Sequence, residues 1–191
     1  MPDLPIPSTP EPPGTTRRSL AVWTLAALGA GAIGAAGWRL YRDQPFAPGP
    51  KQLPALDYPI IDGRRIGPQD LAGRVTLVQF WATTCAVCVA EMPELMALHA
   101  RYRDRGFELL AIAMPYDRPD RVLEFARRRA LPFPVALDPM GAAVAAWGGV
   151  QGTPATWLVG PDGRIRAHWL GAPNLSAVSA RIEALLATRS G

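Results

Sequence analysis

The stretch FWATTCAVC, residues 80–88, holds both cysteines of the chain and lies where a predicted strand gives way to a predicted helix. The first turn of a helix carries unpaired backbone N–H groups and the positive end of the helix dipole, and both favour a thiolate over a thiol. We therefore expect Cys85 to be the exposed sulfur that attacks a disulfide. Cys88 is then expected to attack the resulting mixed disulfide, which closes a Cys85–Cys88 bond and releases the reduced substrate.

Strand and helix patterns alternate on both sides of this stretch. Strands are expected at residues 75–81, 107–114, 134–137, 155–159 and 165–169. Helices are expected after Cys88 and over residues 119–130, 141–147 and 174–188, the last one capped by Asn174 or Ser176. Turn residues at 160–163 predict that the last two strands form an antiparallel hairpin. This order predicts an α/β fold with a central mixed β-sheet and helices on both faces.

Further residues around the cysteines carry a family resemblance. The stretch resembles the membrane-anchored thioredoxin-like proteins of bacteria, the TlpA, ResA and CcmG group of thiol-disulfide oxidoreductases, whose signature reads W-A-T-W-C-x-P-C-x-x-E-x-P. The matching positions are Trp81, Ala82, Thr83, Cys85, Cys88, Glu91 and Pro93. Residues 152–156, GTPAT, are similar to the family's cis-proline loop. The resemblance covers nearly all of residues 56–191, implies a thioredoxin-like fold, and includes the family's extra strand and helix at about residues 116–137.

The resemblance implies roles for several of these residues. Thr153 and Pro154 are expected to lie against the dithiol, where the backbone of Thr153 pairs with the bound substrate. Glu91 is expected beneath the dithiol on the same helix face, where burial raises the pKa of its carboxyl so that it exchanges a proton with Cys88. The alternative for Glu91 is a solvated glutamate on the helix surface. Pro93 is expected to kink the helix.

The sequence also departs from the family pattern. Gln79 stands where ordinary thioredoxins carry a buried Asp, so Glu91 is the remaining candidate acid. Thr84 replaces the usual Trp before the first cysteine; we assign it to the substrate-binding surface together with Trp81, which either covers the dithiol or is a plain core residue. The dipeptide between the cysteines, residues 86–87, is Ala-Val rather than x-Pro. Because this dipeptide tunes the reduction potential, the direction of electron flow stays open.

The N-terminal part of the chain differs from the rest. Residues 1–18 form a Pro-rich stretch that we expect to be a disordered cytoplasmic tail. Residues 19–42 begin with 20 residues that carry no charge, long enough for an α-helix to cross a bilayer. We expect an uncleaved transmembrane anchor; a cleaved signal peptide and a buried soluble helix are the alternatives. Residues 43–55 form a Pro-rich linker, and residues 56–191 form the thioredoxin-like domain.

The location of the domain follows from its chemistry, because basic residues flank the apolar segment on both sides and do not set its orientation. A dithiol that cycles with disulfides has most to act on in an oxidising compartment. We therefore expect a single-pass protein of the bacterial inner membrane whose catalytic domain faces the periplasm. Its expected partners are substrate proteins with disulfides or thiols and an upstream membrane thiol reductant.

Other classes of function fit less well. The formal net charge is +4, but basic residues do not alternate with aromatic ones, so nucleic-acid binding is not expected. One cysteine pair is too small for a zinc site, and no metal or cofactor is expected. A Cu(I)-binding metallochaperone is the alternative function, because two thiolates suit a soft ion. A thiol peroxidase is not expected, since those enzymes want a Thr at the position of Ala82.

Overall fold

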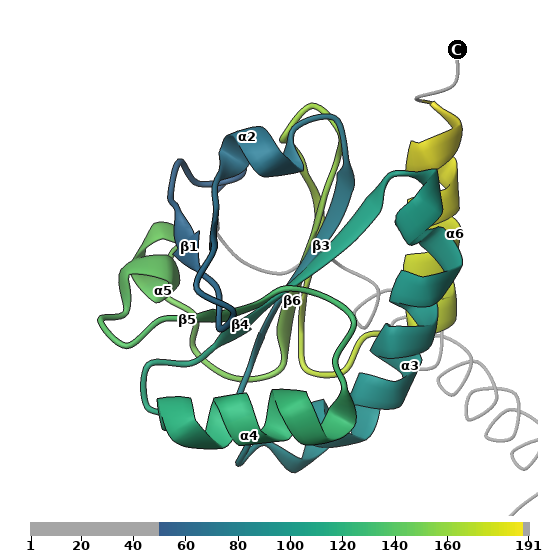
Figure 1. Cartoon of the computed structure of the whole chain (residues 1–191). Helices are drawn as coiled ribbons and strands as arrows, with labels where there is room; N and C mark the ends of the chain where they lie inside the picture. Colours follow the sequence, from purple (N-terminus) through teal and green to yellow (C-terminus); the bar gives the residue numbers. More distant parts are fainter. Residues whose placement is uncertain (1–49, 189–191) are drawn as a thin grey trace, which may run out of the picture. The chain divides into compact units, whose positions relative to one another are not determined.

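The computed structural model of the protein describes residues 50–188 (Figure 1). The predicted tail at residues 1–18, the predicted anchor at residues 19–42 and the first part of the predicted linker, up to residue 49, lie outside this range. Within residues 50–188, no helix is long and apolar enough to span a bilayer.

A five-stranded mixed sheet forms the centre of the domain, with the strand order β5-β4-β3-β6-β7. Strand β3 (Val75–Trp81) pairs in parallel with β4 (Phe107–Ala113), which pairs in parallel with β5 (Val135–Leu137). On its other side β3 pairs antiparallel with β6 (Ala155–Val159), which pairs antiparallel with β7 (Ile165–Leu170). Every residue of β3 is buried. A central strand covered on both faces reads as one continuous apolar run, as this one does apart from a Thr and a Gln.

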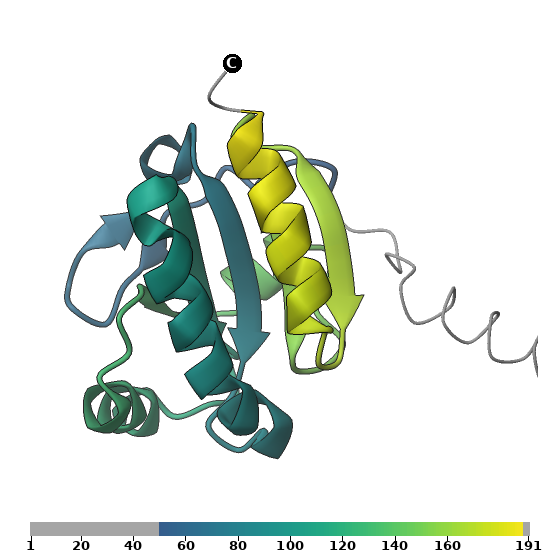
Figure 2. The ribbon, with the colours of Figure 1, turned by 90° about the vertical axis from the view of Figure 1, so that its right-hand side faces the viewer.

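Helices cover both faces of this sheet, as the sequence predicts. Helices α3 (Ala86–Tyr102) and α6 (Leu175–Ala187) lie side by side across one face (Figures 1 and 2). Helix α4 (Pro119–Arg129) packs its buried side against the same apolar cluster, and a short 3-10 helix (Arg103–Arg105) follows α3. The other face carries α5 (Ala142–Ala146).

The strand pleat divides the core into two clusters. Val75, Leu77 and Trp81 of β3 belong to the cluster under α3 and α6. Val78 and Phe80 belong to the cluster on the opposite face. Because successive side chains of a strand point to opposite faces, Gln79 must share the α3 face with Leu77 and Trp81.

The predicted strands and helices are present, and wherever bounds were predicted the ends differ by at most one residue. The segment at about residues 116–137 contains α4 and β5, as the resemblance implies. Asn174 caps α6: its side-chain oxygen accepts hydrogen bonds from the backbone N–H groups of Ser176 and Ala177. Asn174 rather than Ser176 is therefore the cap.

Three short elements at the start of the domain were not predicted. Strands β1 (Tyr58–Pro59) and β2 (Arg65–Ile66) form a small antiparallel pair, and α2 (Pro68–Leu71) follows them. Two-residue strands have no period that a sequence pattern can show. The end of the expected linker also touches the domain, because the backbone N–H of Leu53 donates to the carbonyl of Gly163 over 2.8 Å.

Candidate active site

The two cysteines lie at the start of α3, directly after the carboxyl end of β3. They form a disulfide with the two Cα atoms 5.3 Å apart. Cys85 is the N-cap of the helix, and its sulfur accepts a hydrogen bond from the backbone N–H of Cys88 over 3.2 Å. Cys85 is half-buried, whereas Cys88 is fully buried. The sulfur that a protein substrate can reach is therefore the one that sits at the positive end of the helix dipole.

The loop that leads into the cysteines is fastened by a residue that the sequence analysis missed. The carboxylate of Asp117 accepts hydrogen bonds from both the backbone N–H of Thr83, over 2.5 Å, and its hydroxyl, over 2.7 Å. Asp117 is buried and lies in the loop after β4. Because β3 and β4 are parallel, the loops that follow them meet at one edge of the sheet. The signal in the sequence that could have identified Asp117 is an acidic residue shortly after β4, the strand that pairs with β3.

The cis-proline loop lies beside the cysteine loop, as the resemblance implies. The peptide bond between Thr153 and Pro154 is cis. Ala155, the next residue, is the direct partner of Phe80 in the antiparallel pair of β6 and β3. Thr153 is half-buried and Pro154 is buried. The loop thus enters the sheet at the edge from which the cysteine loop leaves it.

Glu91 is buried on α3, three residues after Cys88, so the two side chains share one face of the helix. One carboxylate oxygen accepts a hydrogen bond of 3.4 Å from the side-chain amide of Gln79. Burial raises the pKa of Glu91 to about 7, and the charge of Glu94 adds to this, while the bond from Gln79 lowers it. The surface alternative for Glu91 is therefore wrong: the side chain is a buried acid that titrates near neutral pH.

Several buried polar atoms around Glu91 are unpaired. Within the described residues, the second carboxylate oxygen of Glu91, the amide oxygen of Gln79, the hydroxyl of Thr156 and the indole N–H of Trp81 have no hydrogen-bond partner. Thr156 is the direct neighbour of Gln79 across the β3–β6 pair. Unpaired buried polar atoms are rare, and each one needs an explanation in terms of function or strain. Gln79 links two of the others, because it donates to Glu91 and is paired in register with Thr156.

The remaining predicted residues separate into buried and exposed ones. Trp81 is fully buried in the cluster under α3 and packs against the ring of Phe125, with ring centroids 5.1 Å apart. Its assignment to the substrate-binding surface is corrected, because a core residue cannot touch a docked protein. Thr84 is exposed directly before Cys85, where a substrate can reach it. Pro93 lies inside α3 and is exposed.

The site offers few ligands for a metal. Across residues 50–188, no group of three or more His, Cys, Asp or Glu side chains is placed to hold a metal ion. The Cu(I) alternative therefore rests on the two sulfurs alone.

Comparisons with known proteins agree with this geometry. Residues 50–168 match the model of the AhpC/TSA family. The chain is 32% identical over 143 residues to the thiol-disulfide oxidoreductase ResA of Bacillus thuringiensis, an alignment that spans 72% of this chain and 81% of the relative.

Solved structures show the same likeness. A protein from Neisseria meningitidis described as a thioredoxin superposes with a TM-score of 0.67 at 32% identity, over 71% of this chain and 89% of its own. A Chlorobium tepidum protein described as the thiol:disulfide interchange protein DsbE superposes with a TM-score of 0.63 at 26% identity, over 72% of this chain and 98% of its own.

Proposed function

The chain belongs to the AhpC/TSA family and is a thiol-disulfide oxidoreductase of the ResA type, and from that premise we propose that it reduces disulfides of other proteins outside the cytoplasm. The observation that carries the disulfide exchange at the centre of this proposal is the difference between the two sulfurs. Cys85 is accessible and receives a backbone N–H at the helix start, whereas Cys88 is buried behind it. This is the arrangement that an attacking and a resolving sulfur require.

The reaction follows from these positions. The Cys85 thiolate attacks one sulfur of the substrate disulfide, forms a mixed disulfide with it and displaces the other substrate sulfur as a thiolate. The Cys88 thiol then loses its proton and attacks Cys85. This closes the Cys85–Cys88 bond, leaves the second substrate sulfur reduced, and passes two electrons from the enzyme to the substrate.

Glu91 is the proposed acceptor of the Cys88 proton. The two side chains share a helix face, and a pKa of about 7 leaves roughly half of the carboxyl groups ionised at neutral pH. An ordinary solvated glutamate would be ionised but a weaker base. The buried position therefore matches the basicity of Glu91 to the step it serves.

The location and the partners are further parts of the proposal. Residues 19–42 would anchor the chain in the bacterial inner membrane as a single span, and the domain would face the periplasm. A membrane thiol reductant would return the Cys85–Cys88 disulfide to the dithiol. Apocytochrome c, in cytochrome c maturation, and a protein of copper-site assembly are substrates of fitting chemistry, because each must keep cysteines reduced in an oxidising compartment.

Reduction of a protein disulfide by the full chain, with dithiothreitol as the electron donor, tests the reductase activity. We expect the natural chain to turn over, and Cys85→Ser to fall to the rate without enzyme. Cys88→Ser is the matched control, because it keeps the attacking sulfur and is expected to accumulate a mixed disulfide with the substrate. Equal turnover by Cys85→Ser and the natural chain would contradict the proposal.

A further inference from the structure

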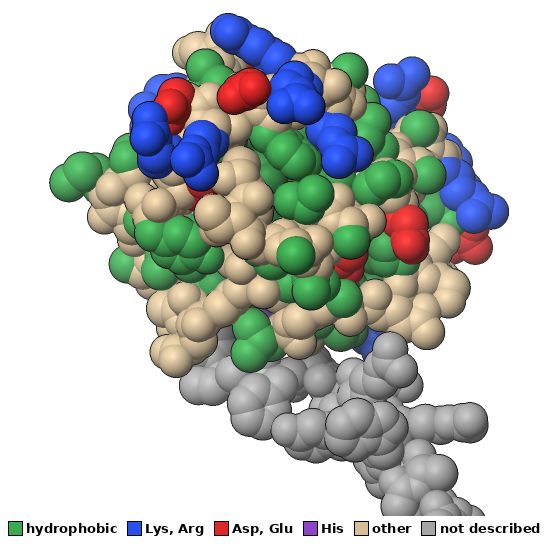
Figure 3. Space-filling model, turned by 90° about the horizontal axis from the view of Figure 1, so that it is seen from below, with side chains coloured by type: hydrophobic (Ala, Val, Ile, Leu, Met, Phe, Trp, Pro, Cys, Tyr) green, Lys and Arg blue, Asp and Glu red, His purple; other side chains and the backbone are tan. Residues whose placement is uncertain are grey.

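A groove runs from the active-site loop along α4, and its walls carry an excess of positive charge. It is lined by Thr83, Thr84, Arg121, Glu124, Phe125, Arg128 and Arg129 and has a volume of about 340 Å³. Figure 3 shows Lys and Arg side chains across the upper part and the right-hand margin of a face whose middle holds many hydrophobic side chains. Because Thr84 directly precedes Cys85, the groove opens beside the sulfur that attacks the substrate.

The three arginines of the groove are only partly neutralised. Arg128 lies 3.5 Å from the carboxylate of Glu124, an exposed pair of the kind that contributes little. Arg129 lies over the ring of Phe125, with its guanidinium carbon 5.6 Å from the centroid, which orders the side chain without cancelling its charge. Arg121 makes no ion pair within the described residues. The groove therefore keeps a net positive charge.

Exposed apolar residues mark the rest of the same end of the domain. Tyr116 follows β4, Met140 follows β5, and Leu170 is the last residue of β7. Val87 lies between the two cysteines. The carboxyl ends of β3, β4, β5 and β7 all lie at one edge of the sheet, because β7 runs parallel to β3 through two antiparallel pairings. The exposed apolar residues and the charged groove therefore belong to the same end of the domain as Cys85.

We propose that the α4 groove binds acidic residues of a protein substrate that lie close to its reactive cysteine. The inference rests on the proposed reductase function and adds a preference to it. Charge complementarity carries it: aspartate or glutamate side chains match guanidinium groups in shape and charge, and the groove is continuous with the active-site loop. Long-range attraction to the groove also raises the rate of encounter, and salt screens this attraction.

Single-turnover reduction of synthetic peptides tests the proposal with the full chain. Each peptide carries one cysteine as a neutral 2-thiopyridyl mixed disulfide, flanked by either aspartate or serine residues. The Cys85 thiolate bonds to the peptide sulfur and displaces 2-thiopyridone, which is followed by its absorbance. Cys88 then closes the Cys85–Cys88 disulfide and releases the peptide thiol.

We expect the acidic peptide to react about tenfold faster than the serine peptide at low salt, with the difference lost at about 0.5 M salt. In the triple variant Arg121→Gln, Arg128→Gln and Arg129→Gln, the two peptides should react at the same rate.

The triple variant Arg101→Gln, Arg103→Gln and Arg105→Gln is the matched control. It removes the same total charge at the other end of α3, roughly 25 Å from Cys85 along the helix, and is expected to keep the preference. A preference that survives in the α4 variant, or that is lost equally in the control variant, would overturn the proposal. So would equal rates for both peptides with the natural chain, a result that leaves the reductase function intact. Failure of both peptides to react would overturn that function and the preference with it.

Discussion

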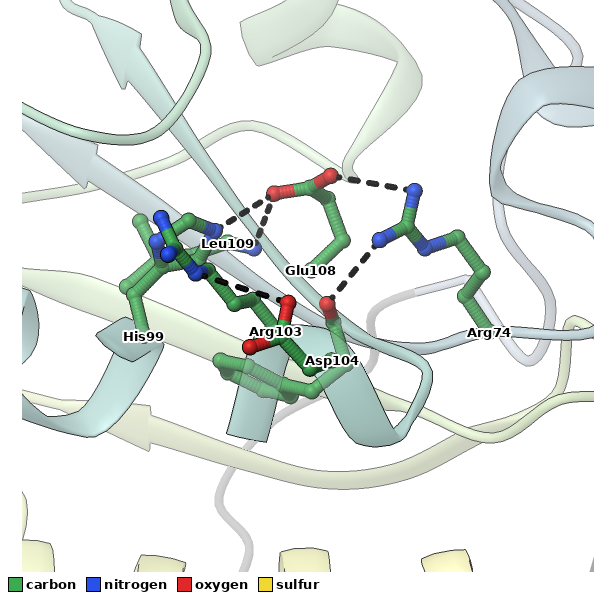
Figure 4. A network of polar contacts seen from close by, with 7 residues as sticks. Arg74, His99, Arg103, Asp104, Glu108 and Leu109 are labelled. Carbon is green, nitrogen blue, oxygen red and sulfur yellow. Dashed lines mark hydrogen bonds and ion pairs between the residues drawn. The ribbon is translucent and has the colours of Figure 1, made fainter. Parts of the chain in front are cut away.

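Two carboxylates packed around helix α3 show how burial changes the pKa of a glutamate that has few hydrogen-bond and ion-pair partners and of one that has several. Glu91, near the start of the helix, has one weak hydrogen bond, from Gln79, and burial raises its pKa to about 7. Glu108 packs against the far end of α3, where it accepts hydrogen bonds from the ring of His99 and the backbone N–H of Leu109 and pairs with Arg74 at 3.3 Å (Figure 4). Burial alone would raise the pKa of Glu108, but these partners hold it below its usual value.

The difference separates Glu91, the proposed proton acceptor, from Glu108, a structural clamp. Glu108 stays ionised across the neutral range and ties α3 to β4 and to the residue before β3. Glu91 changes its charge within that range, one helix turn after Cys88, the sulfur that loses a proton in the proposed reaction. On the proposed mechanism, the same residue type serves folding at one end of the helix and chemistry at the other, and the partners decide which.

Glu91→Gln is expected to give the largest effect on catalysis. Without a proton acceptor next to Cys88, the resolving step should slow by about 100-fold, the lower end for a lost general base. The pH dependence of that step near pH 7 should also disappear. Rapid mixing with a protein disulfide, followed by trapping of the mixed disulfide across pH 6–8, measures both. An unchanged pH profile would show that Glu91 is not the acceptor.

Glu108→Gln should instead act on stability. We expect a loss of about 2 kcal/mol in the free energy of unfolding at pH 7, because Arg74 and His99 lose a charged partner. Because the folded-state pKa is lowered, the stability that Glu108 supplies to the natural chain is present above the unfolded pKa and is lost as the pH falls through the folded value. Urea unfolding of both proteins checks this. If Glu108→Gln slowed thiol exchange and left stability unchanged, the assignment of stability to this end of α3 and of catalysis to the other end would be wrong.

Stability as a function of pH gives a second result for Glu91→Gln. The folded-state pKa, about 7, exceeds the ordinary 4.5, so the natural chain loses stability as the pH rises from about 4.5 to 7. A pKa shift of this size limits the loss of unfolding free energy to roughly 3 kcal/mol. Because the site relaxes when Glu91 ionises, we expect a loss of about 1.5 kcal/mol. The oxidised Glu91→Gln variant should therefore be more stable than the natural chain at pH 8 and equal to it at pH 4. Urea unfolding at both values measures the gap, and a variant that is less stable at pH 8 would refute the expectation.

Asp117→Asn is expected to give the smallest effect and sharpens the comparison. Asp117 lies at the dithiol end of α3 but accepts two hydrogen bonds from Thr83, so its partners make it a clamp like Glu108. We expect a loss of about 1 kcal/mol of stability and less than a threefold change in exchange rate. Thermal unfolding together with the exchange assay checks both. If Asp117→Asn lost as much activity as Glu91→Gln, the distance of a carboxylate from the dithiol, and not its hydrogen-bond partners, would decide whether it takes part in catalysis.

The sequence carries the parts of the fold that depend on local pattern. Apolar runs and turn residues predict the five strands of the sheet and the four longer helices, and the helix start places both cysteines. It also predicts Glu91 as the acid, through the family resemblance. Strands of two residues carry no period, so β1 and β2 were missed.

What the sequence could not give depends on which segments meet in space. Asp117 reaches Thr83 only because β3 and β4 are parallel neighbours, and Thr156 lies beside Gln79 only through the register of β3 and β6. The burial of Trp81, on strand β3, depends in the same way on Phe125 of helix α4. Neither the register nor these contacts between distant segments can be read from spacing along the chain.

The reduction potential of the Cys85–Cys88 couple in the full chain tests the proposed reductase most directly. One backbone N–H favours the Cys85 thiolate, while Cys88 is buried among apolar residues and close to an acid, so the reduced state gains little extra stabilisation. Equilibration with glutathione or dithiothreitol buffers should therefore give a potential near the roughly −270 mV of thioredoxin. A value near roughly −120 mV, typical of a strong oxidant, would contradict the account.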